Sequence, residues 1–195
     1  MDYTTLEVVK RLLGENSTGN DIDIQSTIDA ACRAIDNWCG RSFGLSEITT
    51  RDFRAADSVV DNILYVGDIE PAAGVTVHYR TLPTGSDIDV EASAIVYPLV
   101  VREGWPKDSI ELRADSGEQI SWSYPFVAVT AKWGWPYVPA GVKYAAALYA
   151  TRLFRRFDSA LGVTGSAEFG QTYVRKIDPD ITAVLRDFKR RELLL

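Results

Sequence analysis

The stretch that most constrains the fold of this chain is residues 126–158, FVAVTAKWGWPYVPAGVKYAAALYATRLFRRFD. Its first eight residues fall into two alternating sets, which is the period of a β-strand. Gly134 and Pro136 end that strand, and Pro139 fits the first turn of a helix, where no amide donor is needed. Apolar side chains then recur at spacings of three and four, which predicts a helix with one apolar face. That face comprises Val142, Ala146, Tyr149, Leu153 and Phe157.

Two further features of this predicted helix concern its packing. Three successive alanines at 145–147 would let a second helix approach closely. The remaining face is polar and carries Lys143, Thr151, Arg152 and Arg155. The stretch therefore predicts a junction at which a β region gives way to a helical one.

Two helices are predicted before the β region. The sequence TTLE forms a capping box with Thr4 as the cap, and Gly14 ends this short helix. Asp21 or Asp23 caps the second helix, which we expect to span residues 21–39. Its apolar stripe has helical spacing and consists of Ile24, Ile28, Ala31, Cys32, Ile35, Trp38 and Cys39.

The second helix holds both cysteines of the chain, Cys32 and Cys39. Seven residues at about 1.5 Å each separate them by roughly 10 Å, whereas a disulfide needs Cα atoms within about 7 Å. We therefore expect free, mostly buried thiols, which is typical of a reducing compartment.

Between residues 48 and 133 the apolar period changes to two. Strands are predicted at 48–54, 63–66, 75–81, 94–100, 109–112, 119–123 and 126–133, separated by glycine and proline turn signals. The predicted fold class is α+β, a small helical bundle from the N- and C-terminal segments with an inserted antiparallel β-rich region like a sandwich or barrel. In that division, residues 1–45 and 138–195 form the helical body and residues 46–137 form the insertion.

The residues after the long helix divide into a loop and a last helix. Residues 159–176 contain three glycines and predict a mobile loop. Asp178 caps the last helix, and Pro179 takes its first position. Four side chains of this helix are expected to face inward: Ile181, Val184, Leu185 and Phe188.

Composition excludes several classes of protein. The formal net charge is −6, which argues against a general nucleic-acid binder with a basic footprint. The charge is uneven, because residues 139–195 hold 10 Lys+Arg against 6 Asp+Glu, a net of +4, and residues 1–138 carry the balance of −10. No stretch approaches the roughly 18 consecutive apolar residues of a membrane span, and the N-terminus does not resemble a secretory signal.

No motif in the chain requires an enzyme. His78 is the one histidine and lies in a strand pattern, so neither a zinc site of the usual spacing nor a histidine-based catalytic group is predicted. No nucleophile elbow, phosphate-binding loop or dinucleotide fingerprint occurs, and we expect no cofactor. Asp87 and Asp89 could serve as a glycosidase pair, but a solvated loop or a contact with a cation fits their surroundings better. Four tryptophans could line a sugar-binding face, although β regions commonly bury them: Trp105, Trp122, Trp133 and Trp135.

Both ends of the chain resemble a known family. TTLEVVKRLLG at 4–14, followed by DIDIQSTIDAACRAIDNWCGRSF at 21–43, is similar to the opening of the gp6-like head–tail connector (adaptor) proteins of tailed phages. The segments 138–163 and 168–190 resemble the C-terminal half of adaptors from phages of actinobacteria. The resemblance covers about half of the chain. The β-rich middle departs from the smallest family members, which are mostly helical.

The resemblance implies a structural protein of the virion neck, assembled in the host cytoplasm. Such adaptors form a homo-oligomeric ring, a dodecamer, beneath the portal protein. The ring extends the DNA channel, touches the genomic double-stranded DNA only transiently and without sequence preference, and presents a surface to the next neck or tail-completion protein. No membrane partner is implied.

Three groups of residues take roles under this resemblance. The C-terminal helix and tail would dock on the portal through Arg186, Lys189, Arg190, Arg191, Leu193, Leu194 and Leu195. The loop would face a neighbouring subunit or the channel with Leu161, Phe169, Tyr173, Arg175 and Lys176. A ring-forming face of the long helix would carry Arg152, Arg155 and Arg156.

Two other functions stay open at this point. A tail-completion or tail-terminator ring would suit a β-rich core of this size. A carbohydrate-binding or hydrolytic β module would use the tryptophans, and it predicts a change in tryptophan fluorescence with glycans.

Overall fold

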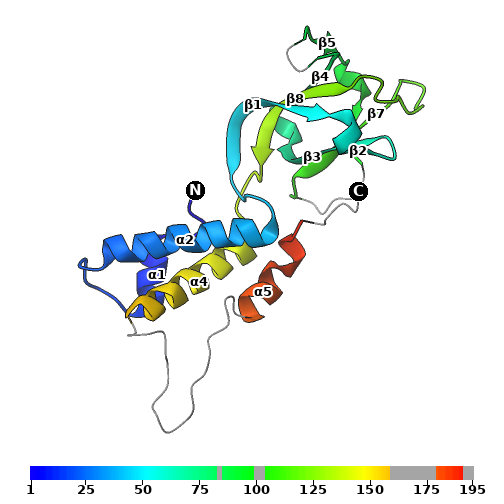
Figure 1. The fold of residues 1–195 in the computed structure, drawn as a ribbon. Coiled ribbons are helices and arrows are strands. Elements are labelled where there is room, and N and C mark those ends of the chain that lie inside the picture. The colour runs from blue at the N-terminus through cyan, green and yellow to red at the C-terminus, as the bar shows by residue number, and fades with distance from the viewer. Residues whose placement is uncertain (83–84, 99–103, 159–178, 191–195) are drawn as a thin grey trace. The chain divides into compact units, whose positions relative to one another are not determined.

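The chain was examined as a computed structural model, which describes residues 1–82, 85–98, 104–158 and 179–190 (Figure 1). The described residues divide into two compact units. Residues 1–42 join the residues after 137 in a helical unit, and residues 43–137 form a unit built on a β-sheet. The fold is α+β, as predicted, with helices from both chain ends packed together and an antiparallel, curled half-barrel sheet inserted between them in sequence.

The helical unit contains four α-helices and a short 3-10 turn in its described part. Their bounds are α1 (Leu6–Leu13), α2 (Asp21–Cys39), α4 (Ala140–Asp158), α5 (Pro179–Leu185) and η4 (Arg186–Phe188). The predicted span of α2 is confirmed, and Pro179 begins α5 as expected. Asp178, the predicted cap of α5, lies outside the described residues. None of the described helices has the length and apolar character needed to cross a membrane.

Two predicted helix caps are wrong. The cap of α1 is Thr5, whose hydroxyl accepts a hydrogen bond from the Val8 amide at 3.4 Å, while Thr4 is buried one residue earlier. The cap position of α2 is Asn20, which makes no side-chain capping bond. The two expected cap residues, Asp21 and Asp23, lie instead in the first turn of α2, where a carboxylate still favours the helix dipole.

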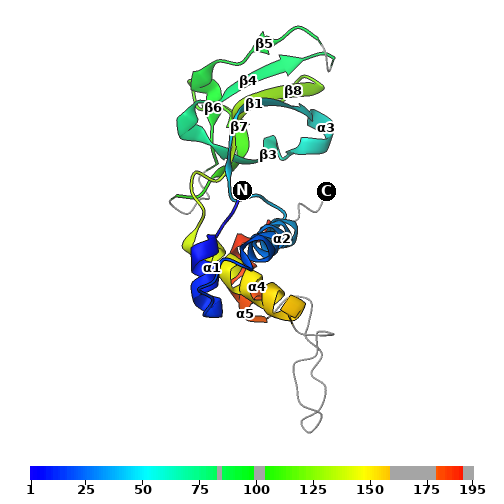
Figure 2. The ribbon, with the colours of Figure 1, turned by 90° about the vertical axis from the view of Figure 1, so that its left-hand side faces the viewer.

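Small side chains line the contact between α2 and α4, which run side by side in Figures 1 and 2. The buried face of α4 consists of Val142, Ala145, Ala146, Ala147, Ala150 and Thr151. Three of these are the successive alanines, which are buried, as a close contact with another helix requires. Thr151 was expected on the polar face but is buried, because its hydroxyl donates to the Ala147 carbonyl at 2.8 Å and needs no water.

The short helix α5 packs against the start of α4. Ile181 and Leu185 are each about 1% exposed, whereas Val184 and Phe188 are half-buried. Gly141 makes this contact possible, since a Cβ at that position would lie 3.2 Å from the Phe188 ring. The inward face predicted for the last helix is therefore the face that packs.

Both thiols of the helical unit are free and buried, as predicted. Burial raises the pKa of Cys39 to about 12 and also raises the pKa of Cys32. Cys32 also accepts a hydrogen bond from the Tyr3 amide at 3.3 Å. Both cysteines therefore stay protonated at neutral pH and act as packing residues.

The described part of the sheet unit has eight strands, and all of their pairings are antiparallel. The strands are β1 (Leu45–Arg54), β2 (Val59–Val60), β3 (Ile63–Glu70), β4 (Thr76–Arg80), β5 (Ile88–Asp89), β6 (Ile95–Val96), β7 (Lys107–Leu112) and β8 (Phe126–Gly134). Short helical turns interrupt them at α3 (Ala55–Ser58), η1 (Pro71–Ala73) and η2 (Ala92–Ala94). The order is β5-β4-β8-β3-β7-β6, with β1 also paired to β8 and β2 to β3.

The strand β8 is the centre of this sheet. Its whole length pairs with β1, while its other edge pairs first with β4 and then with the end of β3. Every second side chain of β8 enters the core, as the predicted alternation requires. The core contains Leu64, Val66, Ile69, Val77, Ile110, Leu112, Val127, Val129, Ala131 and Trp133.

Two of the predicted strands are wrong in whole or in part. The expected strand 119–123 forms only a single bridge at Gln119, and the described part of the expected strand 94–100 is a strand only at Ile95–Val96. Asn62 explains the first difference. The Asn62 side chain donates to the Ile120 carbonyl at 2.9 Å, and the Asn62 backbone carbonyl accepts from the Trp122 indole at 3.0 Å.

Candidate assembly surfaces

The basic residues predicted to dock on a partner are exposed where they are described. Arg186, Lys189 and Arg190 follow α5 and lie on the surface of the helical unit. The backbone that carries them is fixed, because the Arg190 amide donates to the Cys39 carbonyl at 2.7 Å, at the end of α2. The Lys189 ammonium also lies 6.0 Å from the centre of the Trp38 ring. The surface is therefore charged but held on packed structure.

The C-terminal end of α2 lies beside this basic segment. The last carbonyls of a helix carry partial negative charge, which favours positive side chains nearby. Gly40 ends α2 with φ +66°, and the Arg190 side chain lies 3.5 Å from where a Cβ of residue 40 would be. Sequence periodicity predicts the helix end but not which distant segment covers it.

The arginines of α4 have intramolecular partners. Arg152 lies 3.8 Å from the Asp180 carboxylate of α5, and Arg155 donates to the Leu12 carbonyl of α1 at 3.4 Å. Arg156 is half-buried. Two of these three residues thus connect α4 to its neighbours within the unit, and their role in a ring stays a prediction.

The remaining predicted partner-contacting residues lie outside the described residues. They are Leu161, Phe169, Tyr173, Arg175, Lys176, Arg191, Leu193, Leu194 and Leu195.

The start of α2 forms an acidic and partly apolar surface. Asp23 is exposed, and Ile22 beside it is 86% exposed. Asp21 is bound by the Lys10 ammonium of α1 at 2.5 Å, which fixes the turn between the two helices. A single exposed apolar side chain is common on protein surfaces, so Ile22 does not by itself mark a contact surface.

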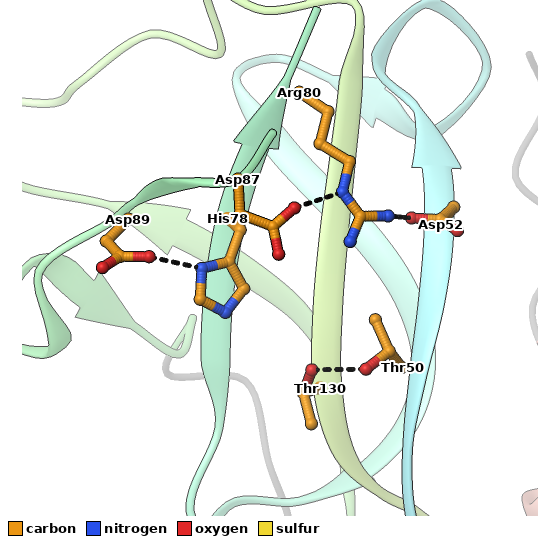
Figure 3. A network of polar contacts seen from close by, with 7 residues as sticks. All are labelled: Thr50, Asp52, His78, Arg80, Asp87, Asp89 and Thr130. Atoms are coloured by element: carbon orange, nitrogen blue, oxygen red, sulfur yellow. Dashed lines mark hydrogen bonds and ion pairs between the residues drawn. The ribbon is translucent and has the colours of Figure 1, made fainter. Parts of the chain in front are cut away.

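A polar network crosses four strands on one face of the sheet (Figure 3). The Arg80 guanidinium on β4 is bound by Asp52 of β1 and by Asp87, which precedes β5. Next to it, His78 Nδ1 lies 2.8 Å from the Asp89 carboxylate. The network therefore ties β1, β4 and β5 together across β8.

Two further observations describe this network. The hydroxyls of Thr50 and Thr130 share a hydrogen bond of 2.7 Å between β1 and β8. The Arg80 guanidinium lowers the pKa of Asp87 below its ordinary value, and Asp87 in turn raises the pKa of Arg80. Asp87 thus contacts a cation, the Arg80 guanidinium, as expected, and Asp89 lies against the His78 ring.

The tryptophans do not form an open binding face. Trp133 and Trp135 are 3% and 1% exposed. The Trp135 indole donates to the Asp68 carboxylate at 3.1 Å, and the Trp122 indole donates to a backbone carbonyl. No group of three or more metal-ligating side chains occurs among the described residues.

The comparisons with known proteins bear on the fold. No protein-family model and no curated protein matches this sequence. Several solved structures, however, match the structure of this chain. The fold of this chain is also found in chains of gene transfer agent particles. One match is a chain in the neck of an empty gene transfer agent particle computed with C6 symmetry, with a TM-score of 0.56 and 13% identity over 97% of this chain and 90% of that one.

A second match is a chain in the virion of a native gene transfer agent particle. It has a TM-score of 0.51 and 18% identity, over 96% of this chain and 89% of that one. Both matches therefore span the helices from the two chain ends and the inserted sheet together. At these identities the comparisons establish a common fold.

Proposed function

We propose that this chain is a structural component of the neck of a tailed-phage-like particle, specifically the head-to-tail connector, or adaptor. The observation that carries the proposal is the fold match to a neck chain over 97% of this chain and 90% of the other. The adaptor-like segments at the two ends of the sequence support it independently. Because those segments build the helical unit, the resemblance and the fold match concern the same part of the molecule.

The proposed adaptor is a ring protein. The matched neck was computed with sixfold symmetry, and a dodecamer contains sixfold symmetry, so both six and twelve copies are compatible with that comparison. Identical contacts repeated around an axis close such a ring. The ring surrounds the DNA channel, where binding to phosphates is weak enough for the DNA to pass.

The helical unit is the proposed portal-binding part. Arg186, Lys189 and Arg190 are exposed on a backbone that is fixed against the end of α2. Exposed cations on ordered backbone suit an acidic partner, because little conformational entropy is lost when they bind. The residues that follow, Arg191 and the three leucines at 193–195, extend this surface in the proposal.

The second candidate is a tail-completion or tail-terminator ring. Sixfold symmetry in the matched neck is compatible with it, because such a ring would share the same axis. A carbohydrate-binding module is disfavoured, since the indoles of Trp122 and Trp135 are already bound within the protein. The adaptor and the tail-completion ring differ in their partner, as only the adaptor binds the portal directly.

Portal binding is therefore the test. The full chain is mixed with assembled portal protein, and the bound fraction is measured by sedimentation for the wild type and for Arg186→Glu/Lys189→Glu. We expect the wild type to sediment with the portal and the double variant to lose most of its binding. The matched control is Lys143→Glu, an exposed cation on α4, which should bind as the wild type does. A wild type that ignores the portal but binds a tail protein would contradict the adaptor role.

A further inference from the structure

The strand β1 is an unusually open edge of the sheet. It is ten residues long, and none of its side chains is buried. Among the described strands it pairs only with β8. Native proteins often protect a long edge with proline, lysine or other charged side chains. β1 contains neither proline nor lysine, and its four charged residues are two acidic and two basic ones. Its one irregularity, between Leu45 and Ile48, leaves Ile48 to Arg54 in unbroken register.

Hydrogen bonds identify which backbone groups of β1 are free to pair. The amides of Trp133 and Trp135 donate toward β1, at Ser46 Oγ and the Gly44 carbonyl. Backbone direction alternates along a strand, so the odd-numbered residues of β8 face β1. Thr49 and Arg51 are opposite such residues and therefore pair with β8.

The even-numbered residues of this part of β1 direct their backbone groups away from β8. Ile48, Thr50, Asp52 and Arg54 carry their N–H and C=O groups on the outer edge of β1. These groups form a regular row of donors and acceptors, which is what an added strand requires.

The opposite edge of the same sheet is β5. The Val90 amide donates to the Val77 carbonyl at 3.0 Å, so Val90 and, two residues earlier, Ile88 pair with β4. By the same alternation, Asp89 directs its backbone groups away from the sheet. The Asp89 side chain is 87% exposed. Within the part of the chain that the structure describes, the sheet β1-β8-β4-β5 thus ends in an edge without a partner strand on both sides.

Strand directions make these two edges compatible with each other. The strands alternate in direction from β1 through β8 and β4 to β5, because all three pairings are antiparallel. In a ring whose axis runs along the strands, β5 of the next copy lies antiparallel to β1. The alternation then continues without a break around the ring, as a head-to-tail contact requires.

Charge favours the same pairing. The segment around β5 is acidic, with Asp87, Asp89 and Glu91 within five residues. On β1, the Arg54 side chain is 63% exposed, and the Arg51 guanidinium lies over the Trp133 ring at 4.2 Å. Because β1 also carries Glu47 and Asp52, its edge is neutral overall. The acidic β5 edge therefore meets no net repulsion on β1, whereas two copies of β5 would repel each other.

We infer that β1 of one copy pairs with the β5 edge of a second copy, so that the sheets of neighbouring subunits form one continuous sheet around the ring. This inference rests on the proposed ring and names the surface that builds it. The pairing is short, since β5 is a short strand, and it adds to the contacts of the helical unit.

Engineered disulfides test the pairing directly. Asp89→Cys is combined in turn with Ile48→Cys, Thr50→Cys and Arg54→Cys. All three positions of β1 face outward, and each would be opposite residue 89 in a different register of the contact between copies. Within one chain β1 and β5 are three strand spacings apart, about 14 Å, which is too far for a disulfide. The native cysteines are buried and do not compete.

The full-length variants are oxidised with the portal present and analysed by non-reducing electrophoresis. We expect at least one double variant to give a ladder of trimers and higher species, while each single-cysteine control stops at dimers. If the particles are rings by mass and imaging but no double variant exceeds dimers, the inference is wrong and the proposed function stands. If the wild type forms no ring and no ladder appears, both the sheet contact and the proposed function are wrong.

Discussion

Gly134 holds the end of β8 against the start of β1, and its replacement by alanine probes that contact. Its φ is +107°, a conformation that side chains rarely adopt, and a Cβ there would lie 1.8 Å from the Gly44 carbonyl oxygen. Ordinary contact begins near 3.4 Å, so the two backbones would have to separate by about 1.6 Å. The Cβ is attached rigidly to one backbone and the carbonyl oxygen belongs to the other, so no side-chain rotation relieves the clash.

The cost of Gly134→Ala follows from two terms. The positive φ costs about 1–2 kcal/mol for a residue with a Cβ. Separation of the strands also breaks the 3.2 Å hydrogen bond from the Trp135 amide to the Gly44 carbonyl, and an unsatisfied buried amide costs about 1–3 kcal/mol. Together these terms predict a loss of about 2–5 kcal/mol in the free energy of unfolding of the sheet unit.

Urea unfolding followed by tryptophan fluorescence measures this loss, because four of the five tryptophans belong to the sheet unit. The matched control is Gly117→Ala, in the same unit. Its φ is +85°, but a Cβ there meets no atom within 4 Å. It should therefore cost only the backbone term of about 1–2 kcal/mol. The reasoning is refuted if the two variants lose the same free energy.

Two further predictions concern titratable groups. In Arg80→Gln the pKa of Asp87 should rise toward its ordinary 3.8, because the guanidinium that lowers it is gone. In the wild type the Arg80–Asp87 pair stabilises the fold above pH 3.8, and this stabilisation is lost as the pH falls through the lower folded pKa. Carboxyl-carbon NMR titration of both proteins measures the shift. In Tyr3→Phe, loss of the 2.5 Å hydrogen bond to the half-buried Asp36 should lower the free energy of unfolding by about 1–2 kcal/mol. Burial raises the pKa of Asp36, and the hydrogen bond from Tyr3 lowers it. The contribution of Asp36 to stability therefore falls as the pH rises from 3.8 to the folded pKa, and the variant should extend this fall to higher pH. An unchanged pH profile in urea unfolding would count against the account.

Sequence periodicity predicts the long elements because their signals are local and repeated. The stretch 126–158 contains both an alternating pattern and a helical one, and the structure has β8 and α4 there. Glycines at helix ends work in the same way, since Gly14 and Gly40 both adopt positive φ at the ends predicted for them. These features depend on neighbours a few residues away.

One misassigned segment depends on a distant partner, whereas the missed strand β2 depends on a local turn. The segment 119–123 alternates like a strand, but the side chain of Asn62, about sixty residues earlier, binds its backbone. The hairpin of β2 and β3 turns at Asp61 and Asn62, which both have positive φ. Turns with positive φ at both central positions favour Gly, Asn and Asp, so this Asp-Asn pair between apolar residues is a local signal that could have revealed the two-residue strand β2.

The candidate surfaces were predictable only in part. Clustered basic residues indicate a charged terminus, but α5 is held by the packing of Phe188 on Gly141, which spacing along the chain does not show. The open edge of β1 was likewise hidden, because its sequence resembles that of any half-buried strand. Edge positions follow from strand order, and strand order is set by pairings between residues as far apart as Leu45 and Gly134.

The most direct test of the proposed neck function is the assembly state of the full chain. Its mass is measured by light scattering, alone and with portal protein, and the same samples are imaged by electron microscopy. The account predicts rings of six or twelve copies around an open channel, formed either by the chain itself or on the portal. A protein that remains monomeric in both samples would contradict the neck-ring function and the sheet contact proposed to build it.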